Sequence, residues 1–176
     1  MAGRRRAVRL LAVASLIGCQ RPGTSVNAAN PSIHVIGSHS RARSGALRIA
    51  WPATQAEFSM RGRSVSVELE DTPVPDDKPE TDRVLVLLDD KPERELALRV
   101  GVHTYELASD VSDGNHHVKL WKQTEADAGT IELRQLMIRG SLVAAPPSLP
   151  ARTMLEAIGD SITVGYGNAA NGVDCA

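Results

Sequence analysis

A serine that follows an apolar segment near residue 160 stands where a nucleophile could act. Residues 154–158 are mostly apolar without alternation, which is typical of a strand buried on both faces of a parallel sheet. The segment ends in Gly159-Asp160-Ser161. A tight turn between a strand and a helix lifts a serine hydroxyl out of the sheet, where N–H groups at the helix start can face an oxyanion. Gly159 suits such a turn because it lacks a Cβ, although Asp160 and Ser161 could equally be helix-capping residues.

The residues after this turn point to one class of hydrolase. Thr163 stands where the G-x-S-x-G nucleophile elbow has its second glycine, so the segment departs from that motif. Residues 156–168 resemble instead the first block of the SGNH (GDSL-type) hydrolases, and Gly-Asp-Ser-Ile-Thr followed by Gly-Tyr-Gly-Asn is most similar to carbohydrate esterase family 2. Upstream segments at 64–67, 112–116 and 120–125 resemble the jelly-roll domain that precedes the catalytic domain in that family.

This resemblance implies a serine esterase acting on polysaccharide. Ser161 would attack the ester carbonyl and its backbone N–H would contribute to the oxyanion hole, with Gly159, Asp160 and Thr163 as supporting motif residues. The implied substrate is acetylated xylan or glucomannan, and no cofactor is implied. The family's remaining oxyanion donors and its catalytic histidine, in an Asp-x-x-His setting, belong to later blocks. All five histidines precede Ser161, so we expect residues 1–176 to be inactive alone, as a fragment of a longer enzyme or a truncated reading frame.

The histidines and cysteines do not form a metal-binding pattern. The sequence has two cysteines, no C-x-x-C pair and no Cys/His cluster. His116 and His117 are adjacent, so in a strand they point to opposite faces and cannot chelate one ion together. We therefore predict no metal site and interpret the histidines as solvated or capping side chains.

The first residues have the pattern of an export signal. Four arginines precede a nine-residue apolar stretch, Leu10–Gly18, which is too short to span a bilayer. Its end, Leu16-Ile17-Gly18-Cys19, resembles the bacterial lipobox, in which the cysteine after the cleavage site is lipidated. Gln20 follows instead of an aspartate, which favours the outer membrane or the cell surface. The alternative is an ordinary signal peptide with an incidental Cys19.

Alternation of apolar and polar residues predicts a mainly β fold. Val65, Val67 and Leu69 alternate with polar residues, and the run 83–88 is apolar on both faces, so we expect it to be a central strand. Asp89-Asp90-Lys91-Pro92 predicts a hairpin turn. Short runs about ten residues apart indicate an antiparallel β-sandwich or jelly roll. Further strands are expected at 47–51, 55–60, 96–100, 103–107, 117–122 and 131–138, with one of the separating turns at Arg61-Gly62.

The predicted organisation has five parts. A Pro-rich segment separates the region of alternating residues from the segment that holds Ser161. The five parts are a lipoprotein signal peptide (1–18), a tether (19–30), a β-sandwich (31–145), a Pro-rich linker (146–152) and the incomplete start of an α/β SGNH-hydrolase domain (153–176).

Composition excludes some functions and leaves two hypotheses. Aromatic residues make up 3% of the chain and its formal net charge is −1, which argues against nucleic-acid binding and against a carbohydrate-binding face built on several stacked rings. The first hypothesis is the N-terminal part of an exported, lipid-anchored serine esterase that deacetylates polysaccharide. The alternative is a non-catalytic surface lipoprotein whose sandwich binds a glycan or a protein partner.

Overall fold

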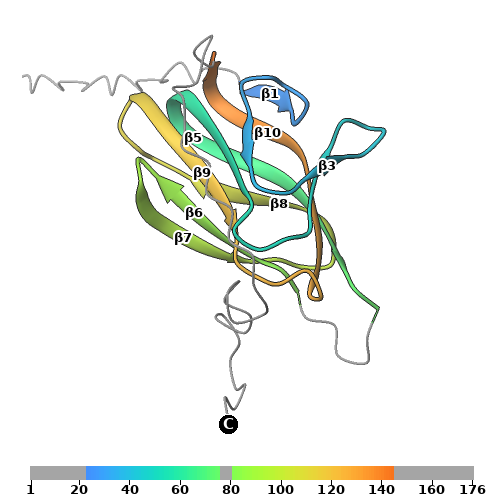
Figure 1. Cartoon of the computed structure of the whole chain (residues 1–176). Coiled ribbons are helices and arrows are strands. Elements are labelled where there is room, and N and C mark those ends of the chain that lie inside the picture. The colour runs from blue at the N-terminus through green and yellow to red at the C-terminus, as the bar shows by residue number, and fades with distance from the viewer. Residues whose placement is uncertain (1–22, 76–80, 145–176) are drawn as a thin grey trace, which may run out of the picture.

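A computed structural model describes residues 23–75 and 81–144, which form ten β-strands (Figure 1). The predicted start of the α/β domain lies outside the described residues. The strands are β1 (Thr24–Asn27), β2 (His34–Ile36), β3 (Ser40–Arg41), β4 (Leu47–Ile49), β5 (Gln55–Pro73), β6 (Arg83–Leu88), β7 (Lys91–Ala97), β8 (Gly101–Ala108), β9 (Gly114–Lys122) and β10 (Gly129–Val143). No helix among these residues is long and apolar enough to cross a membrane.

The strands form one antiparallel sheet that folds into two layers, because β5 and β10 belong to both (Figure 1). In the first layer, the second half of β5 lies between β8 and β10, and β10 pairs in turn with β1 and β4. In the second layer, the first half of β5 pairs with β9, followed by β6 and β7, while β2 and the end of β10 lie on its other side. The predicted antiparallel sandwich is confirmed.

The change of layer takes place at a pair of glycines. Gly62 of β5 lies opposite Gly140 of β10, and both have positive φ, at 156° and 149°. A Cβ at Gly62 would collide with the carbonyl oxygen of Arg139, and one at Gly140 with that of Arg61. The expectation of a turn at Arg61-Gly62 is therefore wrong: this dipeptide is a kink inside a 19-residue strand, and glycine is needed because the two backbones approach closely.

The hydrophobic core lies between the two layers. Apolar residues alternate inward along the long strands β5, β9 and β10, as at Val65, Val67 and Leu69 of β5. Phe58 and Met60, on the other half of β5, are at most 1% exposed, and burying such a side chain stabilises the fold by about 1.5–3 kcal/mol. Aliphatic side chains fill most of the rest: Leu47, Ile49, Val84, Val86, Leu107, Val118, Leu120, Ile131, Leu133, Leu136 and Ile138.

Two further expectations differ from the structure. The run 83–88 forms β6, which lies next to the edge strand β7 and not at the centre, and Val84 and Val86 are its buried residues while Leu85 and Leu87 are half-buried. The segment 19–30, expected as a tether, contains β1, whose four residues pair with β10 and whose Val26 is buried in the core. Among the described residues, the sheet therefore begins at Thr24.

The hairpin between β6 and β7 agrees with its predicted turn. Leu88 pairs with Lys91, and the two residues between them, Asp89 and Asp90, both have positive φ, at 51° and 63°. This is the backbone of a two-residue turn whose twist matches the flanking strands. The tip of the hairpin lies beside β9, which matters for the histidines described below.

Candidate functional site

The residues predicted for catalysis and lipidation lie outside the described part of the chain. They are Ser161, Gly159, Asp160, Thr163 and Cys19. The structure thus describes the module that precedes the predicted active site. Within it, three groups of polar side chains could act chemically: a buried ion pair at the end of β9, a histidine clamp at the β6–β7 turn, and a surface pocket beside Trp51.

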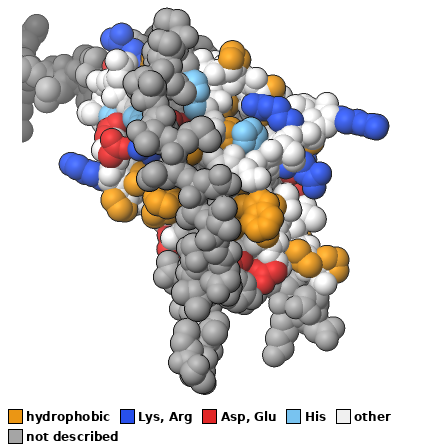
Figure 2. Space-filling model, viewed as in Figure 1, with side chains coloured by type: hydrophobic (Ala, Val, Ile, Leu, Met, Phe, Trp, Pro, Cys, Tyr) orange, Lys and Arg blue, Asp and Glu red, His pale blue; other side chains and the backbone are white. Residues whose placement is uncertain are grey.

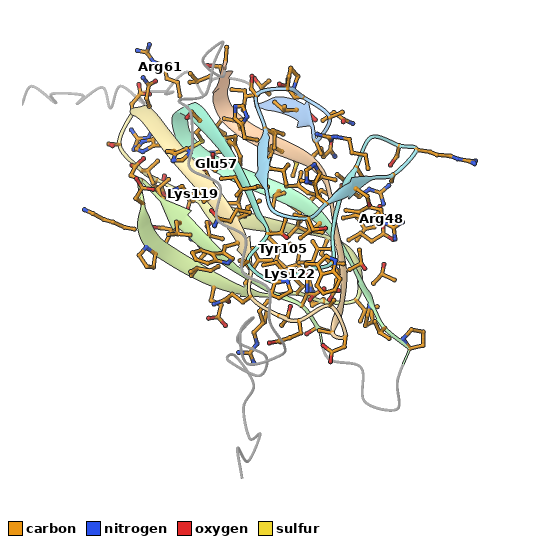
Figure 3. All side chains as sticks on the ribbon, in the orientation of Figure 1. Arg48, Glu57, Arg61, Tyr105, Lys119 and Lys122 are labelled. Carbon is orange, nitrogen blue, oxygen red and sulfur yellow. The ribbon has the colours of Figure 1, made fainter. Side chains whose placement is uncertain are left out.

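The buried ion pair joins Lys122 to Asp82. Their side chains are 1% and 0% exposed, and Lys122 Nζ lies 2.6 Å from Asp82 Oδ1 (Figure 3 labels Lys122 at the end of β9). The same ammonium donates to the carbonyl oxygens of Thr124 (2.8 Å) and Glu125 (3.0 Å) and to the hydroxyl of Thr124 (3.2 Å). The Thr124 hydroxyl donates to Asp82 in turn. A lysine ammonium thus occupies an oxygen-lined cage of the kind that holds a metal cation in other proteins.

A second buried carboxyl group lies against this pair. Asp71 is 2% exposed and its Oδ2 accepts a hydrogen bond from the backbone N–H of Asp82 (3.2 Å). The pKa of Asp71 is raised from 3.8 to about 6, chiefly by burial. The charge and side chain of Asp82 contribute to the rise, whereas the hydrogen bond from the Asp82 N–H and the charge of Lys122 oppose it. Asp71 Oδ1 and Asp82 Oδ2 accept no hydrogen bond from the described residues. A proton on Asp71 balances the charge of two carboxylates against one ammonium.

The histidine clamp holds the loop between β8 and β9. The ring of His116 lies 2.8 Å from Asp89 Oδ2 through Nδ1 and 2.8 Å from the Ser112 carbonyl oxygen through Nε2. Because both neighbours are acceptors, the doubly protonated ring is favoured, and the Ser112 carbonyl and Asp89 raise the pKa of His116. Asp89 also accepts a hydrogen bond from the His117 N–H through Oδ1 (2.8 Å). This hydrogen bond and the one from His116 lower the pKa of Asp89.

The two adjacent histidines have different partners, as their alternation predicts. His116 is buried, and His117 Nε2 lies 3.7 Å from Glu57 Oε2 on the neighbouring strand β5 (Figure 3 labels Glu57). The expectation of solvated or capping histidines is wrong for His116, whose ring is an ion-paired part of the interior. No group of three or more side chains suited to a metal ion occurs among the described residues.

The surface pocket lies at the edge formed by β3, β4 and the start of β10. It has a volume of about 200 Å³. Trp51 is 59% exposed, and Arg48 forms an ion pair with Glu132 through its Nε (3.0 Å). Figure 3 places Arg48 beside β3, away from Lys119 on β9. We call this surface pocket the Trp51 pocket. Its lining consists of Ser38, His39, Ser40, Arg48, Ala50, Trp51 and Thr130.

The sequence holds signals for two of these groups. Lys122 continues the inward series Val118 and Leu120 at intervals of two, so alternation alone would have placed its side chain in the core. Asp89 and Asp90 were recognised as turn residues, but a turn pattern does not show which strand the carboxylates meet. For the Trp51 pocket we find no such signal, because its lining comes from segments 38–40, 48–51 and 130.

The comparison with protein families decides the family of this fold. The carbohydrate esterase 2 N-terminal model matches residues 35–147, more than half of the chain. The chain belongs to that family. Its predicted relation to carbohydrate esterase family 2 is therefore confirmed.

Named relatives and a solved structure agree with the family. The chain is 29% identical over 140 residues to cellulase/esterase CelE of Acetivibrio thermocellus and 30% identical over 127 residues to an acetylxylan esterase / glucomannan deacetylase of Cellvibrio japonicus. These matches cover 79% and 72% of the chain but 16% and 32% of the relatives. A family two carbohydrate esterase from Cellvibrio japonicus has the same fold, with a TM-score of 0.64 at 22% identity over 74% of this chain and 37% of that one. The chain thus spans about a third or less of its curated relatives.

Proposed function

We propose that this chain is the N-terminal part of a serine ester hydrolase that removes acetyl groups from a polysaccharide such as xylan or glucomannan. The observation that carries the proposal is the order of two features. The family match covers the sandwich, residues 35–147, and a Gly-Asp-Ser motif follows it at 159–161. The relatives that match the sandwich include a protein named acetylxylan esterase / glucomannan deacetylase.

Ser161 has the chemical role in this proposal. Its Oγ forms a bond to the acetyl carbonyl carbon while the ester oxygen leaves as the sugar hydroxyl, and water then releases acetate from the acetyl-serine. The backbone N–H of Ser161 donates to the oxyanion of each tetrahedral intermediate. A serine hydroxyl needs a positioned base to react in this way, and His116 does not suit that role because both of its ring nitrogens have partners inside the sandwich.

Anchoring to a membrane is part of the same proposal. The lipobox resemblance at residues 16–19 supports lipidation of Cys19, export, and a place at the outer membrane or cell surface. Polymeric substrates such as xylan lie outside the cell, so an esterase that acts on them must be exported. The sandwich would then stand between the anchor and the catalytic domain.

The test compares Ser161→Ala with the unaltered protein, using the polypeptide that the gene encodes. Acetate release from acetylated xylan and glucomannan should fall by about 10⁶-fold, the loss that removal of the nucleophile causes in a complete serine triad. Ser109→Ala is the matched control, because Ser109 is an exposed residue of the sandwich whose hydroxyl donates to Glu106. It should leave the rate unchanged.

Residues 1–176 alone should hydrolyse no faster than their own Ser161→Ala variant. Deacetylation that survives Ser161→Ala in the encoded protein would show that another nucleophile acts. Ser161-dependent turnover by residues 1–176 would instead show that one of the upstream histidines serves as the base. His117 would then be the first candidate, because its side chain is 35% exposed and its contact with Glu57 is long, at 3.7 Å.

A further inference from the structure

Trp51 is an exposed aromatic ring on a backbone that is held in place. It lies two residues after the end of β4 and is 59% exposed, the largest exposed fraction among the big apolar side chains of residues 23–75 and 81–144. The turn after it is fixed to β9, since Ala53 N–H donates to the Lys122 carbonyl (3.0 Å) and Lys122 N–H donates to the Thr54 carbonyl (3.1 Å). A ring presented in this way loses little conformational entropy when a ligand covers it.

Hydrogen-bonding side chains surround the ring. The Trp51 pocket is lined by two serines, a threonine, a histidine and Arg48. Arg48 uses its Nε for the ion pair with Glu132. Its Nη groups make no hydrogen bond with the described residues, so their N–H donors can reach a ligand. An exposed indole ring surrounded by polar side chains is complementary to a pyranose, which has an apolar C–H face and hydroxyl groups around its edge.

Charge and size restrict the ligand. Because Glu132 neutralises Arg48, the pocket has no excess positive charge for a phosphate or a nucleic acid. Its volume of about 200 Å³ is below the ~300–1,000 Å³ of pockets for drug-sized ligands, so it suits one sugar ring. Where Figure 2 shows described side chains, the hydrophobic ones lie in small groups between polar and charged ones.

We propose that the Trp51 pocket is a subsite for one sugar residue of a neutral β-1,4-linked polysaccharide. The choice of a polysaccharide backbone rests on the proposed function; the site itself rests on the pocket. With a single ring, this subsite adds affinity and orients the polymer, and it is distinct from the extended stacked-ring face that the low aromatic content excludes.

Affinity electrophoresis of residues 1–176 through gels containing xylan, glucomannan or hydroxyethylcellulose tests the proposal. Trp51→Ala should weaken retardation by at least about 10-fold in apparent Kd, and Arg48→Gln by a smaller factor. Trp121→Ala is the matched control, because Trp121 is the other tryptophan and is also exposed, at 37%; it should bind as the unaltered chain does. Trp51 is exposed, so its replacement should leave the melting temperature unchanged.

Fluorescence of the Trp121→Phe variant of residues 1–176 gives a second readout, since Trp51 is then the only tryptophan in these residues. Xylohexaose, cellohexaose or mannohexaose should shift its emission saturably and protect it from acrylamide. Three results would overturn the subsite: equal retardation of Trp51→Ala, no retardation of the unaltered chain, or a Trp51 that acrylamide cannot reach in residues 1–176 without sugar. The last result would mean that other parts of the protein cover this surface.

The two proposals fail separately. Sugar binding that depends on Trp51 but persists in Ser161→Ala supports the subsite whether or not acetate is released. Acetate release that depends on Ser161 without any effect of Trp51→Ala on retardation would keep the esterase and reject the subsite.

Discussion

Lys122 places a positive charge in the interior of the sandwich, where oxygen atoms alone stabilise it. Removing an ammonium from water costs several kcal/mol, and the attraction of Asp82 together with three further oxygen acceptors offsets that cost. Removing one partner of such a buried pair typically costs about 3–5 kcal/mol. Lys122 therefore links Thr124 and Glu125, at the start of the β9–β10 connection, to Asp82, the residue before β6.

Asp71 should make the stability of the sandwich depend on pH. Its pKa is about 6 in the folded chain against an ordinary 3.8, so the folded state binds the proton more tightly. The stabilisation is complete below about pH 3.8 and is lost as the pH rises to about 6. A difference of about two pKa units corresponds to about 3 kcal/mol.

Asp71→Asn should therefore remove this dependence. An asparagine at this position can still accept the hydrogen bond from the Asp82 N–H through its amide oxygen, and, like a protonated Asp71, it carries no charge. We expect the variant to be up to about 3 kcal/mol more stable than the unaltered chain at pH 8, with the difference vanishing near pH 4. Urea unfolding between pH 4 and 8 measures it.

Asp90→Asn is the control for that series. Asp90 is exposed at the hairpin turn, and its hydrogen bond and charge interaction with Lys119 lower its pKa. The control should thus show no gain at pH 8. A constant offset of Asp71→Asn across the whole pH range would mean that Asp71 does not titrate in this window.

At the scale of elements, β1 should contribute to stability although it is short. A chain of residues 31–144 lacks the four register pairs with β10 and the buried side chain of Val26. We expect it to be less stable than residues 23–144 by about 1.5–3 kcal/mol from the loss of Val26 alone. Guanidinium unfolding of the two chains measures the difference.

A point substitution separates the side chain from the backbone pairing. Val26→Ala in residues 23–144 should lower the free energy of unfolding, whereas Val102→Ala, at a residue 44% exposed on β8, should change it little. Equal stability of residues 31–144 and 23–144 would show that β1 is dispensable and that the sandwich begins where the sequence alone placed it.

The sequence predicts those elements whose signals are local. Alternation located most strands, and Asp89-Asp90 located the hairpin because a two-residue turn is a local property. β1 was missed because its partner, such as Leu136 for Val26, lies about a hundred residues away. Gly62 was misread because glycine marks both turns and close backbone approach, and its partner Gly140 decides between them. The sequence does not predict the Trp51 pocket, because its lining residues come from segments that are distant in the sequence.

At the scale of the whole molecule, Cys19 should decide where the protein resides. If Cys19 carries a lipid, Cys19→Ser should move the protein from the membrane fraction to the soluble fraction of its host, because the anchor chains supply the membrane affinity. Immunoblots of both fractions measure this.

The second cysteine provides the matched control. Cys175→Ser alters the same chemical group but lies far from the lipobox, and it should leave the protein in the membrane fraction. An unchanged membrane fraction for Cys19→Ser would reject the lipobox interpretation and leave an ordinary signal peptide or another means of attachment.

The sharing of β10 by both layers also sets the moment at which the sandwich can close during translation. The Thr24 hydroxyl donates to a carbonyl 116 residues further along the chain. The strands β1, β4 and β5 can complete their pairing with β10 only after residue 143 has left the ribosome. At ~5–20 residues per second, synthesis of that interval takes roughly 5–25 s. Throughout this time the apolar face of β5 is open to chaperones. Because β10 is synthesised last among the described strands, it sets the earliest time at which this fold becomes protected.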